Sequence, residues 1–203
     1  MRNICTLCVV CVALAGVVAS AATEVETLMA LWGRDMTVEQ LWRALDPSAL
    51  AGMSPRMRAT KVTWGEPLGP ATAARHEVQV SPLSSGAVLS SLPDISYVFS
   101  PGEVDIYADV AGYGGYSKIT SPRSYAVPYI WVRARLCWNG TTIDQAERGR
   151  YNAYYVAAGG NYTITGPGDY QCVAYHYIQF PTGYSPAEVY GITYSDVYHL
   201  IYW

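Results

Sequence analysis

The stretch YIWVRARLCWNG, residues 129–140, is the part of the chain that decides its fold class. Apolar or small residues occupy every second position of it: Ile130, Val132, Ala134, Leu136 and Trp138. This period of two is typical of a β-strand with one buried face. The Asn139-Gly140 pair that follows favours a tight hairpin turn. The sequence therefore predicts a strand over 129–138 that turns back on itself at once.

Similar short runs continue from residue 102 to the C-terminus. They are EVDIYADV (103–110), YNAYYVA (151–157), NYTIT (161–165), YQCVAYHYIQF (170–180), EVYGITY (188–194) and VYHLIYW (197–203). Turn residues separate several of them, at 159–160, 166–169 and 181–183. Several short strands at close spacing predict a mainly β fold, an antiparallel β-sandwich domain over residues 102–203.

Charge patterning leads to a prediction about which strands pair. In the run 103–110 the outer face would carry Glu103, Asp105 and Asp109, whereas in 129–138 it would carry Arg133 and Arg135. Opposite charges that face each other across a ladder favour pairing of two strands. We therefore expect these two strands to be neighbours, with both arginines on the solvent side.

The N-terminus has the pattern of a secretory signal peptide. One basic residue, Arg2, precedes an apolar run over 4–18, and small residues follow at 19–22. The run is shorter than the roughly 20 residues of a membrane span. We expect residues 1–22 to be a signal peptide, cut after Ala21 or Ala22, which leaves no stable membrane span and places the protein outside the cell or in the cell envelope. The alternative is an uncleaved N-terminal anchor.

Two further regions precede the β-rich part of the chain. Residues 23–57 are expected to be helical, with a capping box formed by Thr37 and Gln40 and an apolar stripe of Leu41, Trp42 and Leu45. This segment would serve as a lid or packing arm, or alternatively as a docking helix for another envelope protein. Residues 58–101 mix possible strands with many prolines and serines, which is typical of either a linker or irregular edge structure.

The cysteines point to one disulfide. Cys5, Cys8 and Cys11 would leave with the signal peptide, and an exported protein most often joins the remaining pair, Cys137 and Cys172. Because Cys137 shares its face with the two arginines of its strand, the bond is expected on the outer face or near a strand end.

The segment DYQC (169–172) resembles the tyrosine corner of immunoglobulin-type sandwiches, in which a Tyr precedes the second cysteine by two residues. This resemblance covers only a few residues. It implies a sandwich that is loosely immunoglobulin-like, with a short N-terminal helical segment added to it.

Composition and motifs limit the classes of function. The 203-residue chain has a formal net charge of −3 and no basic stripe, so nucleic acid is not an expected partner. No H-E-x-x-H or G-x-S-x-G motif occurs. His76, His176 and His199 lack metal-ligand spacing, and His176 is expected to be a hydrogen-bonded histidine of the core or its rim. We therefore predict no catalytic residue, no metal site and no cofactor.

Tyrosine is the most unusual part of the composition, with 18 Tyr and 6 Trp against 2 Phe. The segment AGYGGYSKITSPRSY (111–125) combines Tyr with Gly and Ser, a mixture that binding loops use. From this loop and the strands, six tyrosines are candidates for binding a carbohydrate or an extracellular protein: Tyr113, Tyr116, Tyr125, Tyr154, Tyr175 and Tyr177. The alternative is that tyrosines stabilise the sheet through cross-strand pairs.

These observations predict a secreted or cell-envelope protein that works as a non-enzymatic binding or adhesion module. One alternative is a structural extracellular protein that self-associates, and another is a small secreted hydrolase. Asn139 and Asn161 each begin an N-glycosylation sequon at an expected turn, and both are candidate glycosylation sites.

Overall fold

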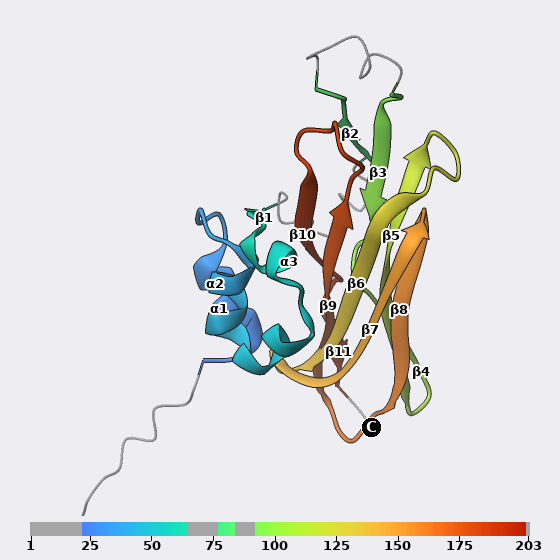
Figure 1. Ribbon diagram of the computed structural model, residues 1–203. Helices are drawn as coiled ribbons and strands as arrows, with labels where there is room; N and C mark the ends of the chain where they lie inside the picture. Colours follow the sequence, from blue (N-terminus) through green and yellow to red (C-terminus); the bar gives the residue numbers. More distant parts are fainter. Residues whose placement is uncertain (1–21, 65–76, 84–91, 202–203) are drawn as a thin grey trace, which may run out of the picture.

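A computed structural model describes residues 22–64, 77–83 and 92–201 (Figure 1). All of the predicted signal peptide except Ala22 lies outside the described residues, and so does part of the mixed region 58–101. The described chain contains eleven strands, three α-helices and one 3-10 helix.

The strands form two sheets. The first, here called the β6 sheet, has the order β1 (Val62–Thr63), β10 (Glu188–Tyr194), β9 (Gly168–Gln179), β6 (Val127–Trp138) and β7 (Thr141–Ala153), and β11 (Tyr198–Leu200) also pairs with β9. The second, here called the β5 sheet, has the order β2 (Glu77–Val80), β3 (Ile95–Phe99), β5 (Val110–Ser121) and β4 (Glu103–Tyr107), and β8 (Tyr155–Thr163) also pairs with β5. Every pair is antiparallel except the short β1–β10 pair. The prediction of a mainly β fold with antiparallel pairing is confirmed.

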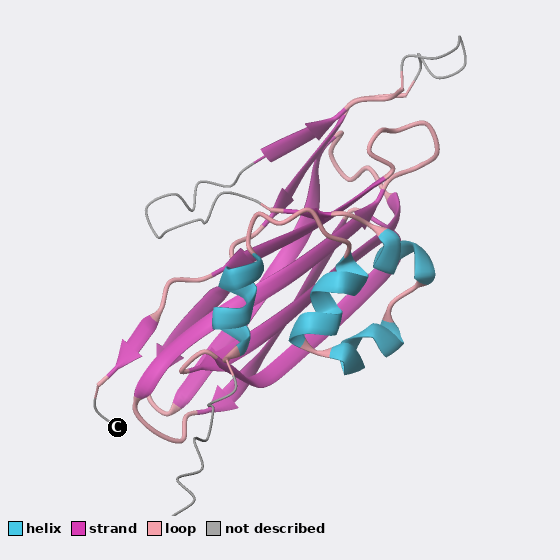
Figure 2. Cartoon of the chain, turned by 90° about the vertical axis from the view of Figure 1, so that its left-hand side faces the viewer, coloured by secondary structure: helices cyan, strands magenta, loops and turns pink. Residues whose placement is uncertain are grey.

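The helices lie together against one face of the β6 sheet (Figure 2). They are α1 (Glu24–Leu31), α2 (Val38–Leu45), the 3-10 helix η1 (Pro47–Gly52) and α3 (Pro55–Ala59). Both α1 and α2 begin with a complete capping box, at Thr23 with Glu26 and at Thr37 with Gln40. The expected helices and the second of these capping boxes are therefore confirmed.

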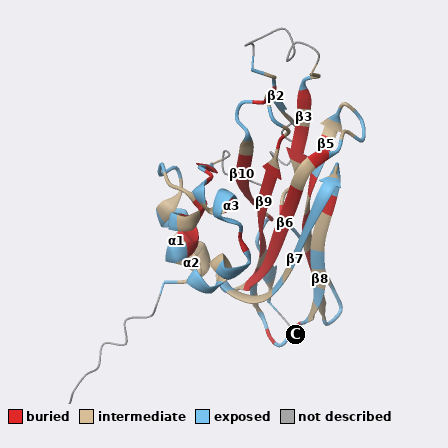
Figure 3. Cartoon of the chain, viewed as in Figure 1, coloured by how far each residue is buried: buried red, intermediate tan, exposed pale blue. Residues whose placement is uncertain are grey.

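Hydrophobic cores lie on both sides of the β6 sheet. On the helix side, Leu41 and Trp42 of α2 pack with Trp131, Tyr175 and Tyr190 of the sheet. On the other side, strand residues of both sheets share two clusters, as the buried positions of β3, β6 and β9 show (Figure 3). The β6 sheet is thus covered on both faces, which makes it the central layer of the molecule.

The predicted pairing of 103–110 with 129–138 is wrong. β4 pairs with β5, whereas β6 lies in the other sheet between β7 and β9. Arg133 and Arg135 are also not on a solvent face, because they are only 5% and 3% exposed beneath the helices. Both guanidinium groups lie over the ring of Trp42, at 4.9 and 4.7 Å from its centroid. Period-two alternation identifies the two faces of a strand, but it does not tell what covers the second face.

The predicted loop 111–125 and the predicted turn at 159–160 are also wrong, because these glycines lie inside paired strands. Gly114 of β5 is directly opposite Gly159 of β8. A Cβ on Gly114 would lie 3.0 Å from the carbonyl oxygen of Ala158, and a Cβ on Gly159 would overlap the carbonyl of Tyr113. Because glycine has no side chain, the backbones of β5 and β8 can approach each other closely here, which is a common reason for glycine within strands.

The predicted disulfide is not formed, since Cys137 and Cys172 are both free and buried. The register explains why. Cys172 is directly opposite Leu136, and Cys137 is opposite Gln171. Neighbouring residues of a strand point to opposite faces, so one thiol faces the helices and the other faces the β5 sheet. The two side chains cannot meet without a change of register.

The local resemblance to a tyrosine corner has a structural counterpart. The hydroxyl of Tyr170 donates a hydrogen bond of 2.8 Å to the carbonyl of Gly166, four residues upstream. Such a bond back to the preceding loop is the defining contact of that corner. It anchors the chain where it enters β9.

Candidate functional site

Three of the six predicted binding tyrosines are buried, so their assignment as exposed binding residues is wrong. Tyr113, Tyr175 and Tyr177 are 6% exposed or less. Tyr175 donates a hydrogen bond of 2.9 Å to Glu24 beneath the helices. Burial raises the pKa of Tyr177 to about 12. These side chains are core residues, which is the alternative that the sequence left open for strand tyrosines.

The other three predicted tyrosines, Tyr116, Tyr125 and Tyr154, are exposed or half-buried. Tyr154 is 43% exposed at the point where the chain leaves β7 and enters β8. Tyr116 is half-buried, and its ring centroid is 5.8 Å from that of Tyr155. Tyr125 is half-buried in the turn that joins β5 to β6. The three tyrosines thus come from β5, the β5–β6 turn and the β7–β8 connection, and β5 is bonded to that connection.

The backbone at this end is held by a few specific contacts. Asn152 adopts φ +48° just before the crossing from one sheet to the other. The carbonyl of Tyr154 accepts a hydrogen bond of 2.8 Å from the amide of Ile119 in β5. Ala153 is opposite Val127 of β6, and Tyr155 is opposite Lys118 of β5. The crossing therefore forms an arch that is tied to both sheets.

Two further aromatic residues, half-buried Tyr129 and exposed Tyr151, are not among the six tyrosines predicted to bind. They are opposite each other in β6 and β7, with ring centroids 4.7 Å apart. Tyr151 is 78% exposed. A Cβ on Gly149 would overlap the hydroxyl end of Tyr129, so that glycine leaves room for the ring. Burial, with Tyr151 and Glu147 nearby, raises the pKa of Tyr129. The sequence gives no sign of this pair, because it depends on the register of β6 with β7.

Four cations lie on the same segments of the chain as these tyrosines, namely β5, the β5–β6 turn and β7. Lys118, Arg123, Arg148 and Arg150 are all exposed. Within the part of the chain that the structure describes, none of the four belongs to an ion pair. We name the whole set the arch surface. Its residues are Tyr116, Lys118, Arg123, Tyr125, Tyr129, Arg148, Arg150, Tyr151, Tyr154 and Tyr155.

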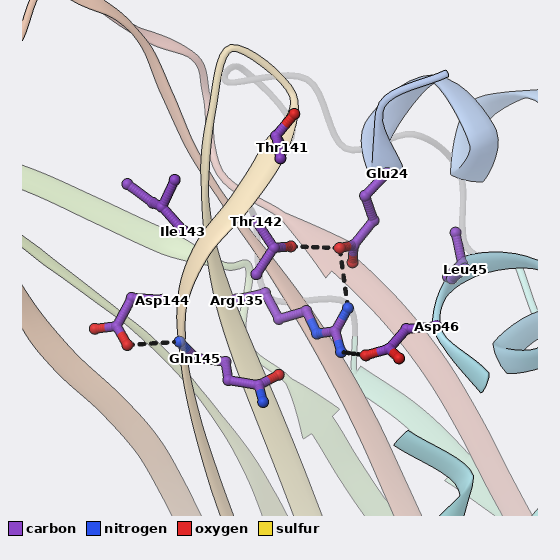
Figure 4. A pocket seen from close by; sticks show the side chains of 9 residues that line it. All are labelled: Glu24, Leu45, Asp46, Arg135, Thr141, Thr142, Ile143, Asp144 and Gln145. Carbon is purple, nitrogen blue, oxygen red and sulfur yellow. Dashed lines mark hydrogen bonds and ion pairs between the residues drawn. The ribbon is translucent and has the colours of Figure 1, made fainter. Parts of the chain in front are cut away.

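A second candidate is an open polar pocket of about 520 Å³ where α1 and the end of α2 meet the β6–β7 hairpin (Figure 4). Its centre is Arg135, which binds Glu24 at 2.9 Å and Asp46 at 2.6 Å. Glu24 also accepts hydrogen bonds from Thr142 and Tyr175. Hydrogen bonding by Ser48, together with Arg135, lowers the pKa of Asp46 despite partial burial.

The bonds in this pocket join helix to sheet and leave few groups free for a ligand. Glu24 comes from α1, Asp46 follows α2, and Arg135 lies on β6. Glu24 and Asp46 both point at the one guanidinium group (Figure 4). The carboxylate pair of a glycoside hydrolase has to face the substrate instead. The cluster therefore resembles a structural clamp more than an active site.

His176 lies in the core, as expected. It is fully buried and stacks on Phe99, with ring centroids 4.6 Å apart. Its ring nitrogens are 3.0 Å from the hydroxyl of Ser117 and 2.9 Å from that of Thr193. Burial lowers its pKa to about 3. In the described ranges no group of His, Cys, Asp and Glu side chains is arranged to hold a metal ion.

The two sequon asparagines are exposed but differ in their surroundings. Asn139 lies in the β6–β7 turn with φ +48°, and its side-chain oxygen accepts a hydrogen bond of 2.9 Å from the amide of Asp169. Asn161 lies within β8 rather than at the expected turn. Both remain candidate glycosylation sites by exposure.

The chain matches no protein-family model, and it shows no significant similarity to a curated protein or a solved structure. Among the residues that the structure describes, no helix is both long and apolar enough to cross a membrane.

Proposed function

We propose that this protein is a non-enzymatic binding or adhesion module that recognises an anionic carbohydrate through the arch surface. The observation that carries this proposal is the combination of exposed Tyr151 and Tyr154 with four exposed cations that form no ion pair within the described residues. The proposal includes export, with residues 1–22 as the signal peptide and the protein acting outside the cell or in the cell envelope. It also includes a loosely immunoglobulin-like sandwich, supported by the two facing sheets and the Tyr170 corner.

The tyrosines supply the part of the interaction that does not depend on charge. A tyrosine ring offers a large, rigid contact area with a polar end, at a low cost in conformational entropy. Tyr129 and Tyr151 already contact each other, and so do Tyr116 and Tyr155. Rings that are held in place in the free protein lose little freedom when a sugar ring packs on them.

The cations supply the preference for an anionic chain. Each exposed ion pair contributes less than about 1 kcal/mol, so one carboxylate or sulfate would not hold the ligand. A polysaccharide repeats its charge along the chain and can engage several cations at once, which multiplies weak contacts. Because these charges are solvated, the binding is expected to weaken as salt is added.

The hydrolase alternative has weaker support. Glu24, Asp46 and Asp144 line one pocket, and the first two of these carboxylates bind Arg135. His176 has two hydroxyl partners and no solvent exposure.

A retention experiment on polysaccharide beads tests the proposed function. The purified protein would be passed over polygalacturonate beads and over neutral dextran beads of the same support, at low and at high salt. We expect retention on polygalacturonate that is lost with added salt and that falls at least about tenfold in Tyr151→Ala/Tyr154→Ala, which corresponds to about 1.4 kcal/mol.

A matched control uses two tyrosines that are exposed elsewhere, Tyr107 and Tyr198, at 84% and 42%. The Tyr107→Ala/Tyr198→Ala variant should be retained like the unmodified protein. Equal loss in both double variants, or no retention on any anionic matrix, would contradict the assignment of the arch surface as the binding site.

A further inference from the structure

Two tyrosine rings face each other across neighbouring strands of the β6 sheet. Tyr129 of β6 is directly opposite Tyr151 of β7, and the ring centroids are 4.7 Å apart with 39° between the ring planes. Directly opposite side chains are the closest cross-strand neighbours in an antiparallel pair. The strand pairing therefore holds the two rings in contact, because it fixes the backbone position of both residues.

This pair is closer than the other two tyrosine–tyrosine ring contacts within the described residues. Tyr116 and Tyr155 are offset by two residues in the register of β5 with β8, and their ring centroids are 5.8 Å apart. Tyr129 also approaches Tyr177, but the centroids are 6.1 Å apart and Tyr177 is only 1% exposed. Of the three contacts, the one between Tyr129 and Tyr151 therefore combines the shortest separation with the most exposed ring.

A reagent in solution can reach this pair from one side. Tyr151 is 78% exposed, and Tyr129 is half-buried. A Cβ on Gly149 would overlap the hydroxyl end of Tyr129, so this glycine leaves the space that the second ring occupies. Tyr151 can therefore react directly, and Tyr129 can exchange an electron and a proton with the ring that it contacts.

We propose that Tyr129 and Tyr151 form a modification site, at which oxidation joins the two rings in a dityrosine cross-link within one molecule. The co-reactant is hydrogen peroxide used by a haem peroxidase, which removes one electron at a time from an accessible phenol. This inference goes beyond the proposed carbohydrate binding and does not depend on it.

The atoms and electrons of this step balance. Each phenol loses one electron and its hydroxyl proton, which gives two phenoxyl radicals in contact. A carbon–carbon bond forms between the two ring positions next to the hydroxyl groups. The two carbon–hydrogen bonds at these positions break, and their hydrogens restore the two hydroxyl groups. The two electrons and two protons that were removed reduce one hydrogen peroxide to two molecules of water.

The geometry favours this bond over one between two molecules. Groups that are already held in contact react as if each were present at a very high concentration of the other. A bond between the rings of Tyr129 and Tyr151 requires their centroids to move only slightly closer. The angle between the ring planes is no obstacle, because two bonded rings can rotate about the bond that joins them.

The cross-link would supply a covalent connection that the cysteines do not provide, since Cys137 and Cys172 are free. It would tie β7, an edge strand of the β6 sheet, to β6 and enclose residues 130–150 in a closed loop. A covalent cross-link stabilises a protein mainly by restricting its unfolded chain. For a loop of this length, we expect the melting temperature to rise by roughly 6–12 °C.

Oxidation of the purified protein by hydrogen peroxide and a haem peroxidase tests the proposal. The protein is kept dilute, so that two molecules seldom meet. We expect dityrosine fluorescence from a chain that still migrates as a monomer on a denaturing gel. Mass spectrometry should show the loss of two hydrogen atoms, and fragmentation of the joined peptides should locate the bond at Tyr129 and Tyr151.

Phenylalanine variants show which rings react. Phenylalanine keeps the ring but has no hydroxyl group to oxidise, so Tyr129→Phe and Tyr151→Phe should each lose nearly all of the dityrosine in the monomer. Tyr107→Phe is the matched control, because Tyr107 is 84% exposed on β4 and takes part in none of the three tyrosine contacts. This variant should yield as much monomeric dityrosine as the unmodified protein. Circular dichroism checks that every variant is folded.

The proposal is overturned if the oxidised monomer contains no dityrosine, or if the bonds form mainly between molecules. It is also overturned if Tyr151→Phe reacts like the unmodified protein, or if the bond joins Tyr116 and Tyr155 instead. Retention on polygalacturonate is measured without oxidant, so a failure of the cross-link leaves the proposed function standing, and loss of retention leaves the cross-link standing.

Discussion

Replacing Arg135 with methionine removes the cation that joins the helices to the β6 sheet. Methionine keeps most of the length and apolar area of the arginine side chain but cannot bind a carboxylate. The Arg135 side chain is 3% exposed, and the side chain of Glu24 that it binds is only 10% exposed. In Arg135→Met the Glu24 carboxylate would stay in this site with only the hydroxyls of Thr142 and Tyr175.

The size of the effect follows from this burial. Removing one partner of a buried ion pair typically costs about 3–5 kcal/mol, since the remaining charge is left without compensation. The cation–π contact with Trp42 is lost as well, but it belongs to the same group and does not add independently. For a chain of this size, such a loss lowers the melting temperature by roughly 6–20 °C.

Urea unfolding followed by tryptophan fluorescence measures the free energy of unfolding of this variant. Arg43→Met is the matched control, because Arg43 also binds a glutamate, Glu39, at 2.6 Å on α2. There the two side chains are 68% and 38% exposed, and the expected cost is only about 0.3–0.5 kcal/mol. The same substitution should therefore have very different effects at the two positions.

A double variant separates the cost of the uncompensated Glu24 carboxylate from the cost of the lost packing. Adding Glu24→Gln to Arg135→Met removes the uncompensated carboxylate, so the double variant should be at least about 1 kcal/mol more stable than Arg135→Met alone. If Arg135→Met and Arg43→Met cost the same within 1 kcal/mol, the buried clamp does not hold the helices, and the reasoning is refuted.

Three further results are expected. Burial lowers the pKa of His176 from 6.5 to about 3, so between these pH values the unfolded state binds a proton that the folded state does not. The free energy of unfolding should therefore fall as the pH drops from about 6.5 towards 3, at up to about 1.4 kcal/mol per pH unit. The His176→Gln variant should show a flatter dependence on pH in urea titrations. Iodoacetamide should label Cys137 and Cys172 only after unfolding, and a cross-linked peptide of the two in mass spectrometry would contradict this. Gly102→Ala would push a Cβ into the carbonyl of Cys172 and should cost about 1–3 kcal/mol in thermal unfolding, whereas Gly52→Ala, with open space around it, should cost close to nothing.

Several elements could be predicted from the sequence because their cause is local. The alternation in 129–138 indicates a strand, and Asn139-Gly140 forms the expected turn between β6 and β7. The capping box at Thr37 forms within one helical turn. In each case the deciding contacts are between residues a few positions apart, so the pattern of neighbours is sufficient.

The candidate binding surface could be predicted only in part. Tyr116, Tyr125 and Tyr154 lie on the arch surface, but Tyr175 and Tyr177 are in the core. A tyrosine in a strand pattern looks the same whether its ring faces solvent or a covering helix. The glycine-rich sequences of β5 and β8 also predict a loop, and only the pairing of these two strands shows that they are not one.

The sequence by itself determined that the chain is mainly β, that helices precede the strands, and where several strands and turns lie. Only the tertiary structure decided which strands are neighbours, which cysteine faces which layer, and which charges are buried. Arg135 joins the helices to the β6 sheet because it binds Glu24, which is 111 residues away in the sequence. Contacts over such separations depend on how whole layers pack, and no periodicity within one strand carries that information.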